Sequence, residues 1–136
     1  MRIVIDSNRI VAALLKDSTT RSILFNNKFD FIAPAFAKEE VEKHRNEFIK
    51  RVGMIPQDFK ILVSLIFESV ALIHKEDYDP VMMGLKSEIS DPQDVPYLAC
   101  CIATHAVGIW SHDPHLKEQA RVRIFTNQDM LRLIHS

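Results

Sequence analysis

Arg2-Ile3-Val4-Ile5-Asp6-Ser7-Asn8 is the stretch of sequence that decides the fold. Its apolar run is typical of a buried strand, and the polar residues that follow favour the start of a helix. The same change, from a short apolar run to acidic residues, recurs along the chain. In an open parallel α/β sheet, residues at the carboxyl ends of neighbouring strands meet at one crevice, where such folds bind ligands. The stretch therefore predicts an acidic crevice at the edge of a parallel sheet.

Four acidic segments are expected at this crevice. Besides Asp6, they are Glu40 within Pro34–Val41, the tetrad Asp91-Pro92-Gln93-Asp94, and Asp113 after the apolar run that ends at Trp110. Carboxylates gathered in one crevice repel one another unless a cation neutralises them. Mg²⁺ and Mn²⁺ prefer carboxylate oxygens and water as ligands. The pattern therefore predicts a site for a hard divalent cation.

The remaining apolar runs alternate between strand and helix patterns, which predicts a three-layer α/β/α sandwich with a five-stranded, mainly parallel sheet. Besides the first strand, we expect strands over Phe29–Ala33, Val70–His74, Val107–Ser111 and Val122–Phe125. We expect a first helix capped by Ser7 or Asn8, a second that starts at Thr19 or Thr20, a third from Ala35 to about Arg51 that Gly53 closes, and a fourth that starts at Pro56. Three more are expected from about Asp94 to His105, over His112–Ala120, and from Asn127 to Ile134. Helical turns and loop are expected over Asp77–Glu88.

Composition is that of an ordinary globular protein. The chain has 136 residues, 47% hydrophobic and 26% charged, which we interpret as a single domain covering residues 1–136. No apolar run is long enough to span a bilayer, and the chain starts with a strand pattern rather than a signal peptide, so we expect a cytoplasmic protein without membrane association. Cys100 and Cys101 are adjacent, which predicts two reduced, buried thiols rather than a disulfide.

The charge balance argues weakly against a nucleic-acid partner. The formal net charge is −1, whereas non-specific nucleic-acid binding normally needs a basic surplus. Two local stretches are nevertheless basic. They are Lys38, Lys43, His44, Arg45, Lys50 and Arg51, and then Lys117, Arg121 and Arg123.

Two of the acidic segments have a structural interpretation beside the functional one. Asp6 could cap the following helix, but Ser7 and Asn8 are also capping residues, so we expect Asp6 to be free for a ligand. Pro96 places the start of the next helix near Asp94, with Asp91 in the preceding loop. These two acids could instead only complement the helix dipole.

For the other polar motifs, the direction in which the side chains point decides which residues can face the crevice. On a helix, Glu40 shares a face with Phe36, which favours Glu40 over Glu39 for the crevice. Ser111, His112 and Asp113 are consecutive on an extended segment and point alternately to opposite faces, which excludes a nucleophilic triad. We expect His112 and His115 to lie at the surface or behind a ligand, because two histidines alone make a poor zinc site.

With these residues in place, the chain resembles the PIN-domain family of metal-dependent ribonucleases over nearly its whole length. The likeness rests on Ile3-Val4-Ile5-Asp6-Ser7-Asn8, Pro34 through Glu40-Val41, Asp91-Pro92-Gln93-Asp94 before Tyr97-Leu98-Ala99, and Ile109-Trp110-Ser111-His112-Asp113-Pro114-His115-Leu116. It implies an acidic pocket for Mg²⁺ or Mn²⁺, with catalytic and metal-ligand roles for Asp6, Glu40, Asp94 and Asp113 and supporting roles for Ser7, Asn8, Asp91 and Ser111. Arg9 and His112 depart from the family pattern.

The resemblance implies an endoribonuclease that hydrolyses RNA phosphodiester bonds. Many family members are toxins of VapC-type toxin–antitoxin pairs, inhibited by a small antitoxin protein, and others act in RNA processing. A catalytically idle PIN-like binding module, in RNA processing or protein assembly, is the alternative. The apolar stripe of the helix from Pro56 to Ser69, widened by Ile61 and Leu65, further predicts a homodimer.

Overall fold

A five-stranded, all-parallel sheet forms the centre of the computed structural model, which describes residues 1–136. The strand order is β3-β2-β1-β4-β5, so the chain starts in the middle strand of the sheet. The strands are β1 (Arg2–Ile5), β2 (Asp30–Pro34), β3 (Val70–Ile73), β4 (Gly108–Trp110) and β5 (Arg123–Phe125). All five lie within a residue or two of the expected positions, and the predicted parallel sheet is confirmed.

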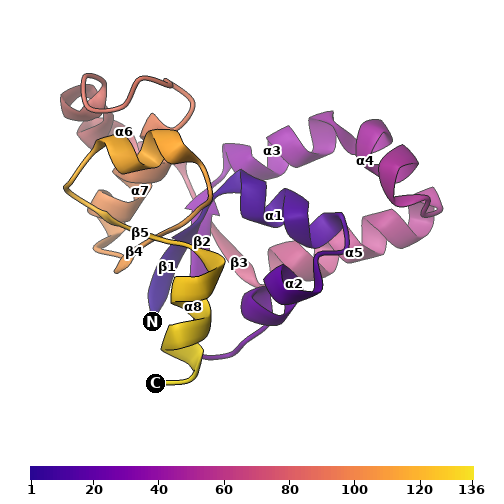
Figure 1. The fold of residues 1–136 in the computed structure, drawn as a ribbon. Helices are drawn as coiled ribbons and strands as arrows, with labels where there is room; N and C mark the ends of the chain where they lie inside the picture. Colours follow the sequence, from indigo (N-terminus) through magenta and orange to yellow (C-terminus); the bar gives the residue numbers. More distant parts are fainter.

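Helices cover both faces of the sheet and give the predicted three layers. They are α1 (Ser7–Leu14), α2 (Ser18–Leu24), α3 (Phe36–Lys43), α4 (Arg45–Val52), α5 (Pro56–Glu68), α6 (Lys75–Met82), α7 (Val95–Thr104) and α8 (Asn127–Ile134), with short 3₁₀ turns η1 (Met83–Leu85) and η2 (Pro114–Glu118). Helix α7 packs across β1, β2 and β4 with α6 against it, and α1, α2, α5 and α8 lie on the other side (Figure 1). Helices α3 and α4 lead away from the sheet and α5 returns to it.

Parallel pairing sets the register that builds the crevice. Ile5 of β1 is paired with Trp110 of β4, so the residues that follow them, Asp6 and Ser111, emerge side by side at the same end of the sheet. The amide of Asp6 donates to the carbonyl oxygen of Trp110 over 3.0 Å. The strand ends are surrounded by a contiguous core of 33 buried apolar residues, which makes this edge a rigid platform.

Gly108 explains how β4 and β5 approach each other. A Cβ atom on Gly108 would lie 2.4 Å from the carbonyl oxygen of Arg123 and 2.5 Å from the ring of Phe125. Only glycine leaves room for this close contact. The position is therefore fixed by packing in the sheet rather than by chemistry at its edge.

The N-termini of the first two helices differ slightly from the sequence interpretation. Asp6, not Ser7 or Asn8, is the N-cap of α1, and its Oδ1 accepts from the amide of Ser7 over 2.7 Å. Helix α2 starts at Ser18, just before the expected start at Thr19 or Thr20, and Asp17 caps it by accepting from the amide of Thr20 over 2.8 Å. In the first case the helix begins directly after the strand, so the last extended residue is Asp6 itself.

The predicted helix from Ala35 to Arg51 is in fact two helices, α3 and α4, which meet at His44. Gly53 ends the second with a left-handed φ of 71°, as expected, and Pro56 starts α5. The helical turns expected over Asp77–Glu88 are present as η1 and the regular helix α6, which begins at Lys75. The helix expected over His112–Ala120 is only the 3₁₀ turn η2.

Two further expectations concern the cysteines and the membrane. Cys100 and Cys101 are free and buried on α7, as predicted, and burial raises the pKa of each thiol to about 12. Neither is therefore a ready nucleophile near neutral pH.

The longest helix, α5, has 13 residues, and none of the helices has the length and apolar character needed to cross a bilayer.

Candidate metal centre

A small pocket of about 130 Å³ opens at the carboxyl ends of β1 and β4. Five carboxylates from four separate chain segments contribute to its wall, together with four other residues. The lining residues are Asp6, Ser7, Asn8, Glu40, Asp91, Gln93, Asp94, Tyr97 and Asp113. The four acidic segments that lie far apart in the sequence are thus brought to one place.

Asp6 lines the pocket and is held by Ser111, which does not itself line it. Both are buried, at 3% and 0% exposure. The hydroxyl of Ser111 donates to Asp6 Oδ2 over 2.6 Å, and Ser111 Oγ in turn accepts from the amide of Asp113 over 2.9 Å and from Asn8 Nδ2 at 3.3 Å. One hydroxyl therefore positions three of the expected site residues.

Asp94 is held at the start of α7 with an unsatisfied carboxylate. It is the N-cap residue of that helix but makes no side-chain capping bond, it is 5% exposed, and its Oδ2 is buried without a hydrogen-bond partner. An unpaired buried oxygen of this kind carries the full cost of its desolvation, which a ligand in the pocket would offset. An interaction with the helix dipole alone thus leaves Oδ2 of Asp94 without a hydrogen-bond partner, and this oxygen is free to bind a ligand.

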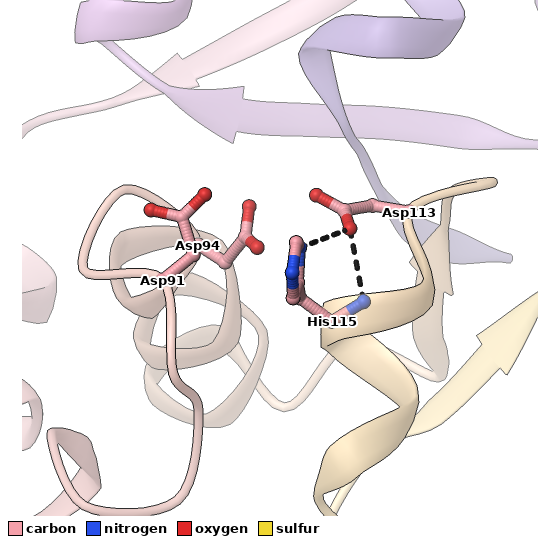
Figure 2. Close-up of side chains that lie close together, drawn as sticks. All are labelled: Asp91, Asp94, Asp113 and His115. Carbon is pink, nitrogen blue, oxygen red and sulfur yellow. Dashed lines mark hydrogen bonds and ion pairs between the residues drawn. The ribbon is translucent and has the colours of Figure 1, made fainter.

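Asp113 faces this carboxylate from the opposite side of the pocket. Its Oδ1 caps η2 by accepting from the amide of His115 over 2.9 Å, and His115 Nδ1 lies 2.9 Å from the same oxygen. Figure 2 shows Asp113 and His115 on one side and Asp91 and Asp94 on the other, with their side chains directed toward the space between. Asp91 is held by its own turn, in which Oδ1 accepts from the amide of Gln93.

The closest metal-ligating atoms belong to Asp91, Asp94, Asp113 and His115, which can each place one atom within 4.8 Å of all the others. Asp6 and Glu40 line the same pocket but lie outside this tight group. Glu40 is half-buried on α3, whereas Glu39 beside it is exposed and does not line the pocket.

Crowding and burial disfavour the charged forms of these acids. Burial raises the pKa of Asp94 from its ordinary value of 3.8 to about 7, and the negative charge of Asp113 adds to the shift. The pKa of Asp6 is raised by burial, although the hydrogen bond from Ser111 opposes this, and the pKa of Glu40 is raised by burial and by the charge of Asp6. The pocket therefore holds more negative charge than it can stabilise alone.

Sequence reasoning gave no part to Tyr97. His115 was expected at the surface or behind a ligand, and it is exposed and contacts the carboxylate of Asp113; its place in the tight group was not expected. The signal was the spacing Asp113-Pro114-His115, in which a capping aspartate draws the residue two positions later toward its own carboxylate. Tyr97 lines the pocket from α7 with a buried hydroxyl that has no hydrogen-bond partner. His112 points elsewhere, since its Nε2 accepts from the amide of Asn127.

Comparison with known proteins agrees with this geometry. The sequence model of the family described as "PIN domain" matches residues 4–129, nearly the whole chain. The chain belongs to the PIN-domain family. A search of curated proteins gave no match.

PIN domains are generally nucleases that depend on divalent metal ions. The residues of this chain fit such an ion, because the unpaired Asp94 Oδ2 and the carboxylates of Asp91 and Asp113 make an oxygen-rich donor set. The fold, the acidic cluster and the family therefore agree on a nuclease-type protein with a site compatible with metal binding.

Proposed function

We propose that this PIN domain is an endoribonuclease that hydrolyses RNA with Mg²⁺ or Mn²⁺. The observation that carries the proposal is the buried, unpartnered Oδ2 of Asp94, directed into a pocket of four further carboxylates. Carboxylates packed so closely raise one another's pKa, and a hard cation is the ligand that would remove this cost.

In this proposal the tight group and the outer acids have different roles. Asp94, Asp113 and Asp91 hold the cation, and His115 fixes the carboxylate of Asp113. A divalent cation supplies Lewis-acid stabilisation of the phosphate charge and makes a water molecule more acidic. Asp6 and Glu40 line the pocket outside the tight group, where a carboxylate can accept a hydrogen bond from the attacking water and orient it.

The supporting residues act through hydrogen bonds that the structure contains. Ser111 holds Asp6 and the backbone at Asp113, and Asn8 completes the bond network through Ser111. Ser7 contributes its amide to Asp6 Oδ1. These contacts keep the acids in place on rigid strand ends, as a preorganised site requires.

Basic residues of α3, α4 and α5 offer contacts for the phosphate backbone. A groove of about 390 Å³ between these helices is lined by Lys38, Arg45 and Lys60, beside Glu42, Ser64 and apolar side chains. Nucleic-acid affinity depends on such local cations more than on net charge. The groove therefore removes much of the objection raised by the net charge of −1.

The biological role proposed from the family resemblance is that of a cytoplasmic toxin restrained by a small antitoxin protein. Induction of the chain in a cell should then arrest growth, and induction of the Asp94→Asn variant should not. Growth that continues unchanged with active wild-type protein would favour RNA processing instead.

Incubation of labelled single-stranded RNA and DNA with purified protein tests the activity itself. We expect cleavage of RNA within the chain, dependent on Mn²⁺ or Mg²⁺ and abolished by chelator. Metal binding without cleavage of either nucleic acid would instead identify a catalytically idle binding module.

A further inference from the structure

A second hollow adjoins the acidic pocket on the side of α3. It measures about 240 Å³ and shares three lining residues with the acidic pocket, namely Ser7, Glu40 and Gln93. The remaining four lining residues are Val11, Val41, His44 and Phe48, contributed by α1 and by the junction of α3 with α4. Contacts between α1 and α3 bring these elements together, and Figure 1 shows α1 beside α3.

The chemistry of this hollow differs from that of the acidic pocket. Val11, Val41 and Phe48 give it apolar surface, and the ring of His44 lies with its centroid 6.2 Å from that of Phe48. Gln93 adds a side-chain amide, which both donates and accepts hydrogen bonds, at the boundary between the two spaces. Its lining therefore suits a flat ring with polar edges.

The break between α3 and α4 creates this arrangement. His44 is at once the residue after α3 and the residue before α4, with φ of −100° and ψ of 17°. Phe48, one turn further along α4, is buried against the core, whereas His44 is exposed. The hollow thus has an apolar inner wall and an accessible aromatic side chain at its edge.

We propose that this hollow binds an unstacked nucleobase of the nucleotide next to the scissile phosphate. Single-stranded RNA is recognised largely by splayed bases that stack on Phe, Tyr, Trp or His side chains. The hollow, at about 240 Å³, is larger than the acidic pocket, at about 130 Å³, and has room for a planar base. Because the hollow and the acidic pocket share a wall, a phosphate at the acids places its neighbouring base within reach.

Other ligand classes fit this lining less well. The seven lining residues include no lysine or arginine, so a phosphate group would meet no fixed cation and would face Glu40. An acidic peptide side chain meets the same objection. A second hard metal ion would find a single carboxylate, that of Glu40, which is a poor donor set.

This inference rests on the proposed function, and its test separates the two. The probe is a set of single-stranded RNA oligonucleotides, each with one abasic position, cleaved with Mn²⁺ by wild-type protein. We expect one position next to the cleaved bond at which loss of the base lowers kcat/KM by about tenfold or more. His44→Ala and Val11→Trp, which respectively remove the stacking ring and fill the hollow, should lower cleavage of intact RNA and should show a much smaller abasic penalty at that position.

Two controls distinguish a lost base contact from a lost fold. His135→Ala, an exposed histidine on the far C-terminal segment, should behave as wild type. Both hollow variants should keep the Mn²⁺-dependent rise in melting temperature, because they leave the acids intact. If loss of the base lowers kcat/KM equally in wild type, His44→Ala and Val11→Trp, or lowers it at no position, the base site is overturned and the nuclease proposal stands. If wild type cleaves no intact oligonucleotide, the nuclease proposal is overturned, and the base site with it.

Discussion

Ser111 Oγ donates a 2.6 Å hydrogen bond to Asp6 Oδ2, although the two residues are 105 positions apart in the sequence. Parallel pairing of Ile5 with Trp110 places them side by side, and both are fully or almost fully buried. This contact links the first strand to the fourth at the level of the acidic pocket. The geometry of the site thus depends on the sheet rather than on any single loop.

Replacement of Ser111 by alanine should weaken this support. Ser111→Ala removes a donor to buried Asp6 and an acceptor for the amide of Asp113, so we expect a loss of about 1–3 kcal/mol in the free energy of unfolding. Metal-dependent cleavage should fall as well, because Asp6 loses its fixed orientation. Denaturant unfolding and cleavage assays measure the two effects. Ser22→Ala, at an exposed position on α2, is the matched control, and an equal loss in both variants would contradict the role given to Ser111.

The acids should differ sharply in their effect on activity. Glu40→Gln, which alters a residue lining the pocket, should lower metal-dependent RNA cleavage by at least tenfold, whereas Glu39→Gln beside it should have little effect. The amides keep the shape of the side chain and remove only its charge, so melting temperatures should change little. Initial cleavage rates at saturating Mn²⁺ provide the comparison. The opposite ranking would show that the wrong face of α3 had been assigned to the site.

The stability of the metal-free protein should depend on pH through Asp94. Its folded pKa of about 7 lies above its ordinary value of 3.8, so the native state holds this proton more tightly than the unfolded state does. The corresponding stabilisation is present below pH 4 and is lost as the pH rises to 7, by an amount on the order of 1–3 kcal/mol. Asp94→Asn cannot lose this proton. In chelator, the free energy of unfolding of wild type relative to Asp94→Asn should therefore fall between pH 4 and pH 7, and a constant difference across this range contradicts the raised pKa.

Gly108 offers a test of the sheet that is independent of the site. Gly108→Ala forces a Cβ against the backbone of Arg123 and the ring of Phe125, and should destabilise the fold by about 1–3 kcal/mol or more. Gly84→Ala, where an added Cβ meets no atom within 4 Å, should change stability by less than about 0.5 kcal/mol. Thermal or denaturant unfolding of the two variants gives the comparison. Equal stability of the pair would mean that β4 and β5 are not packed as described.

Self-association stays a prediction, based on the outer face of α5. Ile61 and Leu65 are 59% and 48% exposed there, four residues apart on one face of the helix. We expect light scattering at tens of micromolar, a range suited to micromolar affinities, to show a dimer. The double variant Ile61→Asp with Leu65→Asp should be monomeric and still folded. A monomeric wild type under these conditions excludes the dimer.

The fold was predictable because each strand is a short apolar run followed by helical periodicity. The predictions that were wrong concern helix caps and helix ends, where several neighbouring residues could take the same position. Asp6 and Asp17 cap their helices although Ser, Thr or Asn residues stand directly behind them. The break at His44 has no glycine or proline to mark it, since Phe36–Val52 contains neither. Local propensity therefore gives no sign of this break.

The candidate site was predictable only in outline. The rule that parallel strand ends converge was enough to expect Asp6, Asp94 and Asp113 in one place, and they do line one pocket. The distances between these side chains could not be predicted from the sequence, because they depend on the conformation of loops. The turn at Asp91 and the contact of His115 with Asp113 bring these two residues into the tight group, a result of loop conformation that no periodicity encodes.

Calorimetric titration of Mn²⁺ into the metal-free protein at pH 7 tests the central claim most directly, because it detects the cation site without assuming a substrate. Wild type should bind Mn²⁺, and Asp94→Asn should bind at least tenfold more weakly, since it loses the charge on the one carboxylate of the pocket that has a buried oxygen without a partner. Asp58→Asn, an exposed acid on α5, is the control and should bind as wild type does. Absence of binding to wild type, or equal binding by wild type and Asp94→Asn, would contradict a metal centre built on this cluster.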